Sequence, residues 1–306
     1  MTTTRAFQAP PGLAPGARVA VIAPASAFDR DSFENGLACI SARYDVHYRS
    51  ALFERHRYLA GSDERRLTEL ADALLDPTIK AVFCARGGYG ATRLLPRLAA
   101  LASHPPKPLI GFSDITALHL WLQRLGTISI HGPVLTQLGL LPGETRERLF
   151  HLLESPAPAP PLHGSDTWVS GVVEGPLLGG NLSVVTRMLG TPYLPSLAGA
   201  ILLLEDVGER PYRLDRMWTH LGLAGVLRQV RGIALGSFTN CEERDADYRA
   251  ADVLRELAEA TGLPCAAGFP IGHGAANEPV PLGARVRLDA GARSLTFLEG
   301  AVTPGV

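Results

Sequence analysis

The sequence has few cysteines, and none of them stand close together. The four are Cys39, Cys84, Cys241 and Cys265, and no CxxC pair occurs. Zinc knuckles and thioredoxin-like redox sites both require closely spaced cysteines, so the sequence offers neither. We expect four separate, buried and reduced thiols.

Long apolar runs are also missing. The longest apolar stretch that includes small residues, 197–204, is far shorter than the roughly 20 residues that a membrane-spanning helix needs. Residues 1–16 contain polar residues and prolines but no apolar segment of the kind found in signal peptides. These two absences predict a soluble cytoplasmic protein.

The charges are balanced, with 29 Lys and Arg against 30 Asp and Glu and a formal net charge of -1. Nucleic-acid binding calls for a clustered excess of basic residues, which the sequence lacks. What is present is apolar material: 46% of the 306 residues are hydrophobic, enough for a full core. This length suits one large domain or two of ordinary size.

Short apolar segments alternate with helical ones in the first half of the chain. This alternation is typical of a parallel sheet covered by helices. Continuous apolar runs predict the strands, and leucines at helical spacing predict the helices. The predicted strands are 18–24, 80–85 and 108–112, and the predicted helices are 31–43, 63–75 and 114–125.

A proline-dense stretch, 155–161, separates this half from the second. Such a stretch cannot continue a helix and favours an extended spacer, so we place a domain boundary there. The second half is also predicted to be α/β, although less regular. Its expected elements are strands around 200–204 and 232–236, a helix at 250–261, and short β segments at 285–289 and 294–298.

A serine stands at the first candidate site, Gly111-Phe-Ser-Asp-Ile115. A serine at a strand-to-helix turn lies beside free backbone N–H groups, which suits a nucleophile because these groups can hold an oxyanion. The local sequence alone favours a simpler role for Ser113, that of a helix N-cap. The G-x-S-x-G elbow of α/β-hydrolases is incomplete, since Ile115 replaces the second glycine, and this disfavours an esterase of that type.

A glycine-rich turn, 86–90, follows the predicted strand at 80–85. Such a turn allows the backbone to approach a ligand closely and can direct N–H groups at an anion. The chain lacks the Lys-Ser/Thr pair of a P-loop and a full G-x-G-x-x-G, so a nucleotide-phosphate site is only weakly indicated. A tight turn that needs positive φ is the favoured interpretation.

Two distant polar residues complete the candidates. Glu205 directly follows an apolar strand, and His273 stands between two glycines in a loop. A histidine flanked by glycines is a poor core residue, and its exposure suits a general base. His131, after another predicted strand, could line the same site or serve a turn.

Seven motifs in order resemble the LD-carboxypeptidase family of serine peptidases, also called muramoyltetrapeptide carboxypeptidases. The resemblance covers nearly the whole chain. It reverses the local preference for Ser113 as a simple cap. The motifs are Val19-Ala-Val-Ile-Ala-Pro-Ala-Ser26, Ala85-Arg-Gly-Gly-Tyr-Gly-Ala91, Ile110-Gly-Phe-Ser-Asp-Ile-Thr116, Ile130-His-Gly-Pro133, Gly179-Gly-Asn-Leu182, Leu204-Glu-Asp-Val-Gly-Glu209 with Pro211-Tyr-Arg-Leu-Asp-Arg216, and Gly272-His-Gly274.

The resemblance implies a Ser-Glu-His triad. It assigns the nucleophile to Ser113, the acidic member to Glu205 and the base to His273, and the oxyanion donors to the backbone N–H groups of Gly88 and Asp114. Asp206 and Glu209 compete for the acidic role; Glu205 is preferred because it holds the place that the family motif assigns.

The same resemblance implies the architecture. An N-terminal Rossmann-like domain with a parallel sheet (1–154) would carry the nucleophile, followed by a Pro-rich linker (155–175). A smaller C-terminal α/β domain (176–306) would carry Glu205 and His273, with the active site in the cleft between the domains. A homodimer is also implied.

For function, the resemblance implies cleavage of the L,D bond that releases the terminal D-alanine of a murein tetrapeptide, in peptidoglycan recycling. No metal or other cofactor is expected. A second branch of the family, the microcin C immunity peptidases, hydrolyses an aminoacyl-nucleotide amide and carries a base-stacking Trp before a Gly-Ser/Thr-Pro-Tyr segment. Here Leu189 precedes Gly190-Thr-Pro-Tyr193, which favours the murein substrate. A non-catalytic muropeptide-binding module is the third alternative.

Overall fold

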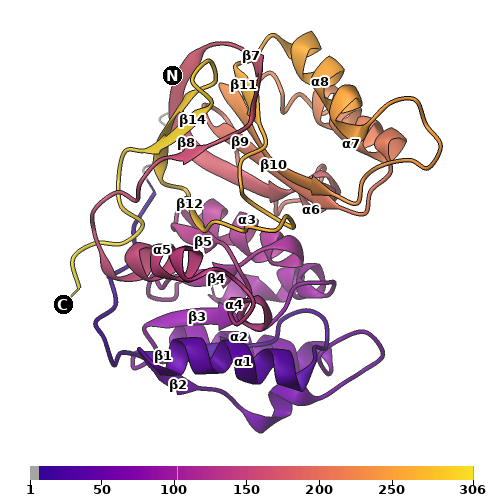
Figure 1. The fold of residues 1–306 in the computed structure, drawn as a ribbon. Helices are drawn as coiled ribbons and strands as arrows, with labels where there is room; N and C mark the ends of the chain where they lie inside the picture. Colours follow the sequence, from indigo (N-terminus) through magenta and orange to yellow (C-terminus); the bar gives the residue numbers. More distant parts are fainter. Residues whose placement is uncertain (1–6, 102, 306) are drawn as a thin grey trace.

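Two β-sheets, each with its own helices, make up the molecule. The computed structural model describes residues 7–101 and 103–305. The first half of the chain builds the lower, purple part in Figure 1, and the second half builds the pink-to-yellow part above it. The predicted α/β class, with a parallel N-terminal sheet and a second α/β domain, is confirmed. No helix of the described residues has the length and apolar character needed to cross a bilayer.

The first sheet has the strand order β12-β5-β4-β3-β1-β2. Strands β1 to β5 are parallel, and all residues of β3, β4 and β5 are buried, as expected for strands with helices on both faces. The elements are β1 (Arg18–Ile22), α1 (Arg30–Ser41), β2 (Asp45–His47), η1 (Ser50–Phe53), α2 (Asp63–Leu75), β3 (Ala81–Cys84), η2 (Ala91–Leu101), β4 (Leu109–Gly111), η3 (Ser113–Ile115), α3 (Thr116–Leu125), β5 (Ser129–His131), α4 (Leu135–Leu138) and α5 (Gly143–Glu154).

The order of the first five strands determines where a ligand can bind. The chain reverses its direction across the sheet between β1 and β3, and crevices at such reversals are the usual ligand sites of open α/β sheets. The segments that leave β1 and β3 are joined there, because the Tyr89 N–H donates to Ser26 Oγ at 3.0 Å and the Ser26 N–H donates to the Gly87 carbonyl at 3.1 Å. The glycine-rich turn therefore lies at this crevice.

The second sheet has the order β6-β14-β13-β8-β9-β10-β11-β7. Its centre, β8 to β11, is parallel, and β6, β7, β13 and β14 are antiparallel additions at the two sides. The elements are β6 (Leu162–His163), β7 (Asp166–Val169), β8 (Val172–Asn181), α6 (Leu182–Arg187), β9 (Ile201–Val207), α7 (Pro211–Leu223), β10 (Gly232–Thr239), α8 (Ala250–Thr261), β11 (Cys265–Ala267), β12 (Val280–Leu282), β13 (Arg285–Asp289) and β14 (Ser294–Phe297).

Strand β12 connects the two halves. It lies late in the sequence but pairs with β5 of the first sheet, where Val280 is opposite His131. Just after it, the Gly283 N–H donates to the Leu177 carbonyl of β8 at 2.8 Å. Residues 155–175, predicted as a linker, contain β6 and β7, which pair with the second sheet. The chain therefore passes between the halves more than once.

Candidate active site

Ser113 lies in a turn with an unusual backbone. It is the first residue of η3, directly after β4, and its φ of 62° is in the left-handed region. A non-glycine residue seldom adopts this region, and a strained serine at a strand-to-helix turn is typical of a nucleophile elbow. Phe112 is the cap residue and no side chain caps this helix, so the capping role that the local sequence favoured is wrong.

Neighbouring residues make room for this turn. A Cβ on Gly87 would lie 2.9 Å from Ser113 Cβ, and a Cβ on Gly111 would lie 3.0 Å from the Ile115 side chain. His119 holds the turn from below: its Nε2 lies 2.8 Å from the Gly111 carbonyl oxygen, and its Nδ1 lies 2.8 Å from Ser129 Oγ. Burial lowers the pKa of His119 to about 4, so this histidine is neutral. The elbow thus forms without the second glycine of the G-x-S-x-G motif.

Glu205 and His273 form a hydrogen-bonded pair. His273 Nδ1 lies 2.6 Å from Glu205 Oε2. The Glu205 side chain is fully buried and that of His273 is 16% exposed. Burial raises the pKa of Glu205, against the opposing effects of the hydrogen bond and charge of His273. A buried carboxylate on one ring nitrogen fixes the imidazole's tautomer and leaves the other nitrogen available for proton transfer.

The two carboxylates that competed for the acidic role have other partners. Asp206 accepts hydrogen bonds from Asn181 Nδ2 at 3.1 Å and from the Ser183 hydroxyl at 2.8 Å. Glu209 accepts a hydrogen bond from Ser183 at 3.3 Å and lies 3.3 Å from Arg213 Nη1. Of the three, Glu205 is the carboxylate that contacts His273. Glu205 lies within β9, which ends at Val207. The sequence predicted that Glu205 follows the strand.

The loop of His273 is held close to Glu205 by a glycine. Gly272 has a φ of 106°, and a Cβ there would lie 2.4 Å from Glu205 Oε2, so no larger residue fits. The Gly272 N–H donates to Asn277 Oδ1 at 2.9 Å across the loop. The Phe112 ring, next to Ser113, packs on the His273 ring with centroids 4.6 Å apart. The histidine therefore faces the serine's segment.

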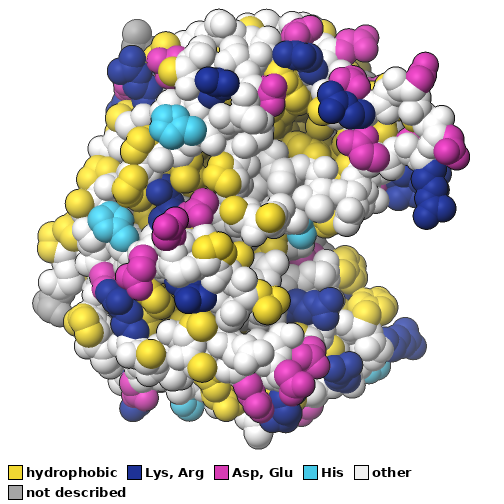
Figure 2. Space-filling model, viewed as in Figure 1, with side chains coloured by type: hydrophobic (Ala, Val, Ile, Leu, Met, Phe, Trp, Pro, Cys, Tyr) yellow, Lys and Arg dark blue, Asp and Glu magenta, His cyan; other side chains and the backbone are white. Residues whose placement is uncertain are grey.

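Ser113 and His273 lie in neighbouring segments without a direct hydrogen bond. Within the described residues, no hydrogen bond joins Ser113 Oγ to the imidazole, although Phe112 contacts both segments. The space-filling view shows a hollow on the right-hand side between the two halves, with Lys and Arg side chains on both its lips (Figure 2). Ser113 follows β4 of the first sheet, whereas Glu205 lies in β9 of the second and His273 follows β11.

The two predicted oxyanion donors lie in neighbouring turns. Gly88 has a φ of 95°, and a Cβ there would lie 2.4 Å from Ser26 Oγ, so the turn needs glycine. Tyr89 and Ala91 donate their N–H groups within the protein, to Ser26 and to Asp114 Oδ2. No hydrogen bond in the described ranges uses the N–H of Gly88 or Asp114. These two N–H groups are therefore available to a ligand.

Sequence reasoning missed the residue that anchors the glycine-rich turn. Arg66, on α2, is 0% exposed. Its Nη1 donates to the carbonyl of Gly90 at 2.8 Å and to that of Pro24, and its Nη2 pairs with Asp63. It thus joins the segments that follow β1 and β3. Nothing in the sequence marks this arginine, because the groups it binds come from distant segments.

His131 does not line the site. It is fully buried at the end of β5, with its ring 5.9 Å from Phe112 and 6.2 Å from His119. Burial lowers its pKa well below the usual value. Within the described residues there is also no group of three or more His, Cys, Asp or Glu side chains that could hold a metal ion.

These features define a two-domain α/β protein with a serine elbow opposite a Glu-His pair. Residues 19–132 match the model of the LD-carboxypeptidase N-terminal domain, and residues 174–288 match that of the C-terminal domain. The chain belongs to the LD-carboxypeptidase family and is a serine carboxypeptidase.

Relatives and solved structures agree with this assignment. The murein tetrapeptide carboxypeptidase of Pseudomonas aeruginosa is 42% identical over 283 residues, which are 87% of this chain and 91% of that one. A putative carboxypeptidase of Synechocystis is 40% identical over 296 residues, 95% and 98% of the two chains. The structure of muramoyltetrapeptide carboxypeptidase from Oxalobacter formigenes matches with a TM-score of 0.83 and 29% identity, covering 94% of this chain and 100% of that one. The microcin C7 self-immunity protein in its wild-type apo state (TM-score 0.85, 22% identity, 97% and 100% covered) shares the fold.

Proposed function

We propose that this protein hydrolyses the L,D bond that releases the terminal D-alanine from murein tetrapeptide, using Ser113, Glu205 and His273 as its triad. The observation that supports this most directly is the 2.6 Å hydrogen bond between the buried Glu205 and His273. The left-handed backbone of Ser113, at the turn between β4 and α3, is the second support. The relative from Pseudomonas aeruginosa, named as a murein tetrapeptide carboxypeptidase, supports the choice of substrate.

In this mechanism His273 accepts the Ser113 proton as the hydroxyl attacks the scissile carbonyl. Glu205 holds the imidazole in the required tautomer and stabilises the imidazolium that forms. The oxyanion of the tetrahedral intermediate is held by the N–H groups of Gly88 and Asp114, neither of which donates to another group in the part of the chain that the structure describes. His273 then delivers the proton to the leaving amine of D-alanine, and water hydrolyses the acyl-enzyme by the same steps.

The physiological role we propose is peptidoglycan recycling in the cytoplasm. An enzyme that removes the terminal D-alanine converts tetrapeptides into tripeptides.

We also propose that the enzyme acts as a homodimer. Solution scattering tests this directly: a monomeric mass at micromolar concentration would contradict it.

Incubation of the purified protein with murein tetrapeptide, followed by mass spectrometry, tests the activity. We expect release of D-alanine and little or no cleavage of an all-L peptide of the same length. Ser113→Ala is the matched control and should lower turnover by several orders of magnitude while the fold is retained. Turnover of that variant within tenfold of the wild type would exclude the serine mechanism. A chelator should have no effect.

An aminoacyl-nucleotide analogue serves as the competing substrate. The residue before the Gly-Thr-Pro-Tyr segment is Leu189, which packs partly against the core and offers no aromatic face for a nucleobase. Faster hydrolysis of the analogue than of the tetrapeptide would reverse the choice of substrate. Tight binding of tetrapeptide without any turnover would instead indicate a binding module.

A further inference from the structure

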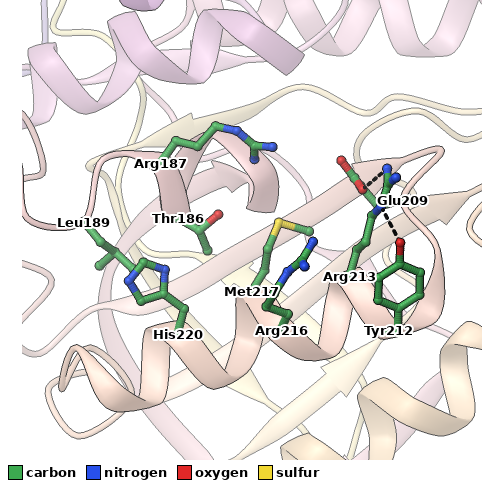
Figure 3. Close-up of a pocket in the computed structure, with 9 residues that line it drawn as sticks. All are labelled: Thr186, Arg187, Leu189, Glu209, Tyr212, Arg213, Arg216, Met217 and His220. Carbon is green, nitrogen blue, oxygen red and sulfur yellow. Dashed lines mark hydrogen bonds and ion pairs between the residues drawn. The ribbon is translucent and has the colours of Figure 1, made fainter.

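A cavity of about 510 Å³ lies between α6 and α7. Figure 3 shows its lining side chains, with the head groups of Arg187, Arg213 and Arg216 on the same side of α7. Glu209 lies at one end of the cavity and His220 at the other, with Met217 between them. The proposed mechanism uses none of these residues.

The cavity contains more positive than negative charge. Glu209 is the one carboxylate among its lining residues, and it pairs with Arg213 at 3.3 Å. Arg187 donates to the Ser183 carbonyl at 2.7 Å, and Arg216 lies over the Tyr212 ring at 5.7 Å. Neither guanidinium forms an ion pair within the part of the chain that the structure describes. Two cationic groups therefore remain for an anionic partner.

Tyr212 lines the cavity, and the pKa of its phenol is lowered by the same arginines. A hydrogen bond from Arg213 lowers the pKa of its phenol, and the charges of Arg213, Arg210 and Arg216 lower it further. Positive charge that stabilises a phenolate would equally stabilise a carboxylate. Arginine suits that role because its planar fork can donate two parallel hydrogen bonds to one carboxylate.

The cavity opens at the same end of the second sheet as the Glu-His pair. β9 carries Glu205 and ends two residues before Glu209, while Asn181, opposite Glu205 in the sheet, is the cap of α6. The Ser183 hydroxyl lies 2.8 Å from Asp206, next to Glu205, and 3.3 Å from Glu209. The Asn181 N–H donates to Thr116 Oγ1 at 3.0 Å, three residues after Ser113. A peptide with its scissile bond at Ser113 would thus have other groups within reach of α6 and α7.

We propose that the arginines of α6 and α7 form a subsite that binds a carboxylate of the substrate away from the scissile bond. This inference rests on the proposed function and identifies how the peptide is recognised. A murein tetrapeptide carries carboxylates on its D-glutamyl and diaminopimelyl residues in addition to its C-terminus. Amidation or loss of one of them removes the charge and leaves the scissile bond unchanged, so the subsite would make the enzyme selective for the charged peptide.

Steady-state kinetics tests the subsite with three peptides: the tetrapeptide, an analogue amidated at its D-glutamyl carboxylate, and an analogue amidated at its diaminopimelyl carboxylate. We expect Arg187→Gln and Arg216→Gln each to raise KM about 10- to 100-fold, since a charge-assisted hydrogen bond is lost, with kcat within about twofold because the group is remote from the reacting atoms. On the analogue that lacks the carboxylate bound by the subsite, the same variants should have nearly the KM of the wild type. Arg255→Gln, which removes an exposed arginine of α8 paired with Glu259, is the matched control and should match the wild type.

The double variant Arg187→Gln/Arg216→Gln completes the test, and several results would overturn the subsite. They are a wild-type KM in the double variant, an equal rise in its KM on all three peptides, or a rise in the KM of Arg255→Gln as large as that of the cavity variants. Inorganic phosphate competing as strongly as the carboxylate-bearing tripeptide product would also contradict a carboxylate subsite. If the wild type releases no D-alanine, the proposed function is wrong, and calorimetry with the tripeptide then decides: no binding, or binding unchanged in the double variant, rejects the subsite.

Discussion

At the scale of single residues, Glu205 shows how one carboxylate is separated from its neighbours. Asp206 is almost as buried, but its oxygens are occupied by Asn181, Ser183 and a backbone N–H. Glu205 has one oxygen on His273, and its other oxygen has no hydrogen-bond partner in the described residues. Two adjacent acids thus have different environments and, we infer, different roles.

Replacing Glu205 with glutamine tests this division. The variant keeps the side chain's shape but loses the charge that orients and stabilises the imidazolium, so we expect kcat to fall by about three to four orders of magnitude. Asp206→Asn is the matched control. It should lower the midpoint of unfolding, because buried hydrogen bonds are lost, and should have a much smaller effect on kcat than the change at Glu205. Equal losses of kcat in the two variants would contradict the assignment of Glu205.

Asp114 gives a prediction about pH. Burial raises the pKa of its carboxyl from 3.8 to about 6, against the lowering by the Ala91 N–H. The folded state therefore binds this proton more tightly, and the contribution of Asp114 to the free energy of unfolding falls as pH rises from 3.8 to about 6, by roughly 2–3 kcal/mol. Asp114→Asn lacks this proton, so its stability relative to the wild type should increase over that interval. Chemical denaturation at several pH values measures this, and parallel profiles would contradict it.

At the scale of elements, the loops that leave the strands carry the site and depend on glycine. Gly272 keeps the His273 loop against Glu205, and Gly88 keeps the glycine-rich turn against Ser26. Both have positive φ, and at both a Cβ would overlap a side-chain oxygen. At both turns, glycine is therefore required for two reasons: the backbone has a positive φ, and there is no room for a Cβ.

Gly272→Ala separates the two requirements when compared with Gly262→Ala. Both glycines have positive φ, but a Cβ on Gly262, at the end of α8, would meet nothing within 4 Å. We expect Gly262→Ala to cost about 1 kcal/mol of stability with kcat unchanged. Gly272→Ala should in addition displace Glu205 or His273 and reduce kcat at least 100-fold. A Gly272→Ala variant with wild-type kcat would show that the pair tolerates displacement.

Much of the element order could be predicted from the sequence. Helices 63–75 and 250–261 have the predicted bounds, because apolar periodicity and local caps determine them. The helix predicted at 114–125 instead begins as η3 and continues as α3. The left-handed backbone of Ser113 depends on space left by Gly87 in another loop. The local sequence around Ser113 instead predicted an ordinary helix N-cap. The Arg66 anchor and the arginine cavity likewise depend on contacts between distant segments, which local patterns do not report.

At the scale of the whole molecule, the proposed nucleophile and the proposed acidic member of the triad belong to different sheets. Ser113 follows β4 of the first sheet, whereas Glu205 lies in β9 of the second. Because no hydrogen bond joins Ser113 Oγ to His273 within the described residues, we expect the halves to move closer when the peptide contacts both.

Crystal structures of the wild-type enzyme with and without the tripeptide product test this movement. We expect the distance between Ser113 Oγ and His273 Nε2 to shorten to about 2.6–3.2 Å in the complex, together with a change in the angle between the two sheets. An unchanged angle with the two atoms still apart would reject domain closure and leave the triad assignment standing.

Strand β12 has a consequence for how the chain matures during synthesis. The ribosome releases β1 to β5 early, but the strand that pairs with β5 is made only after nearly the whole second half. Domains usually fold as they emerge, first part first. Here the nascent first half has an uncovered strand edge, a surface that favours aggregation. Only when Val280–Leu282 is added is that edge closed, and the same event brings the loop of His273 to its place between the two sheets. We therefore expect a chain truncated before Val280 to lack activity even where the strands of its first sheet have paired, because β5 would have no antiparallel partner.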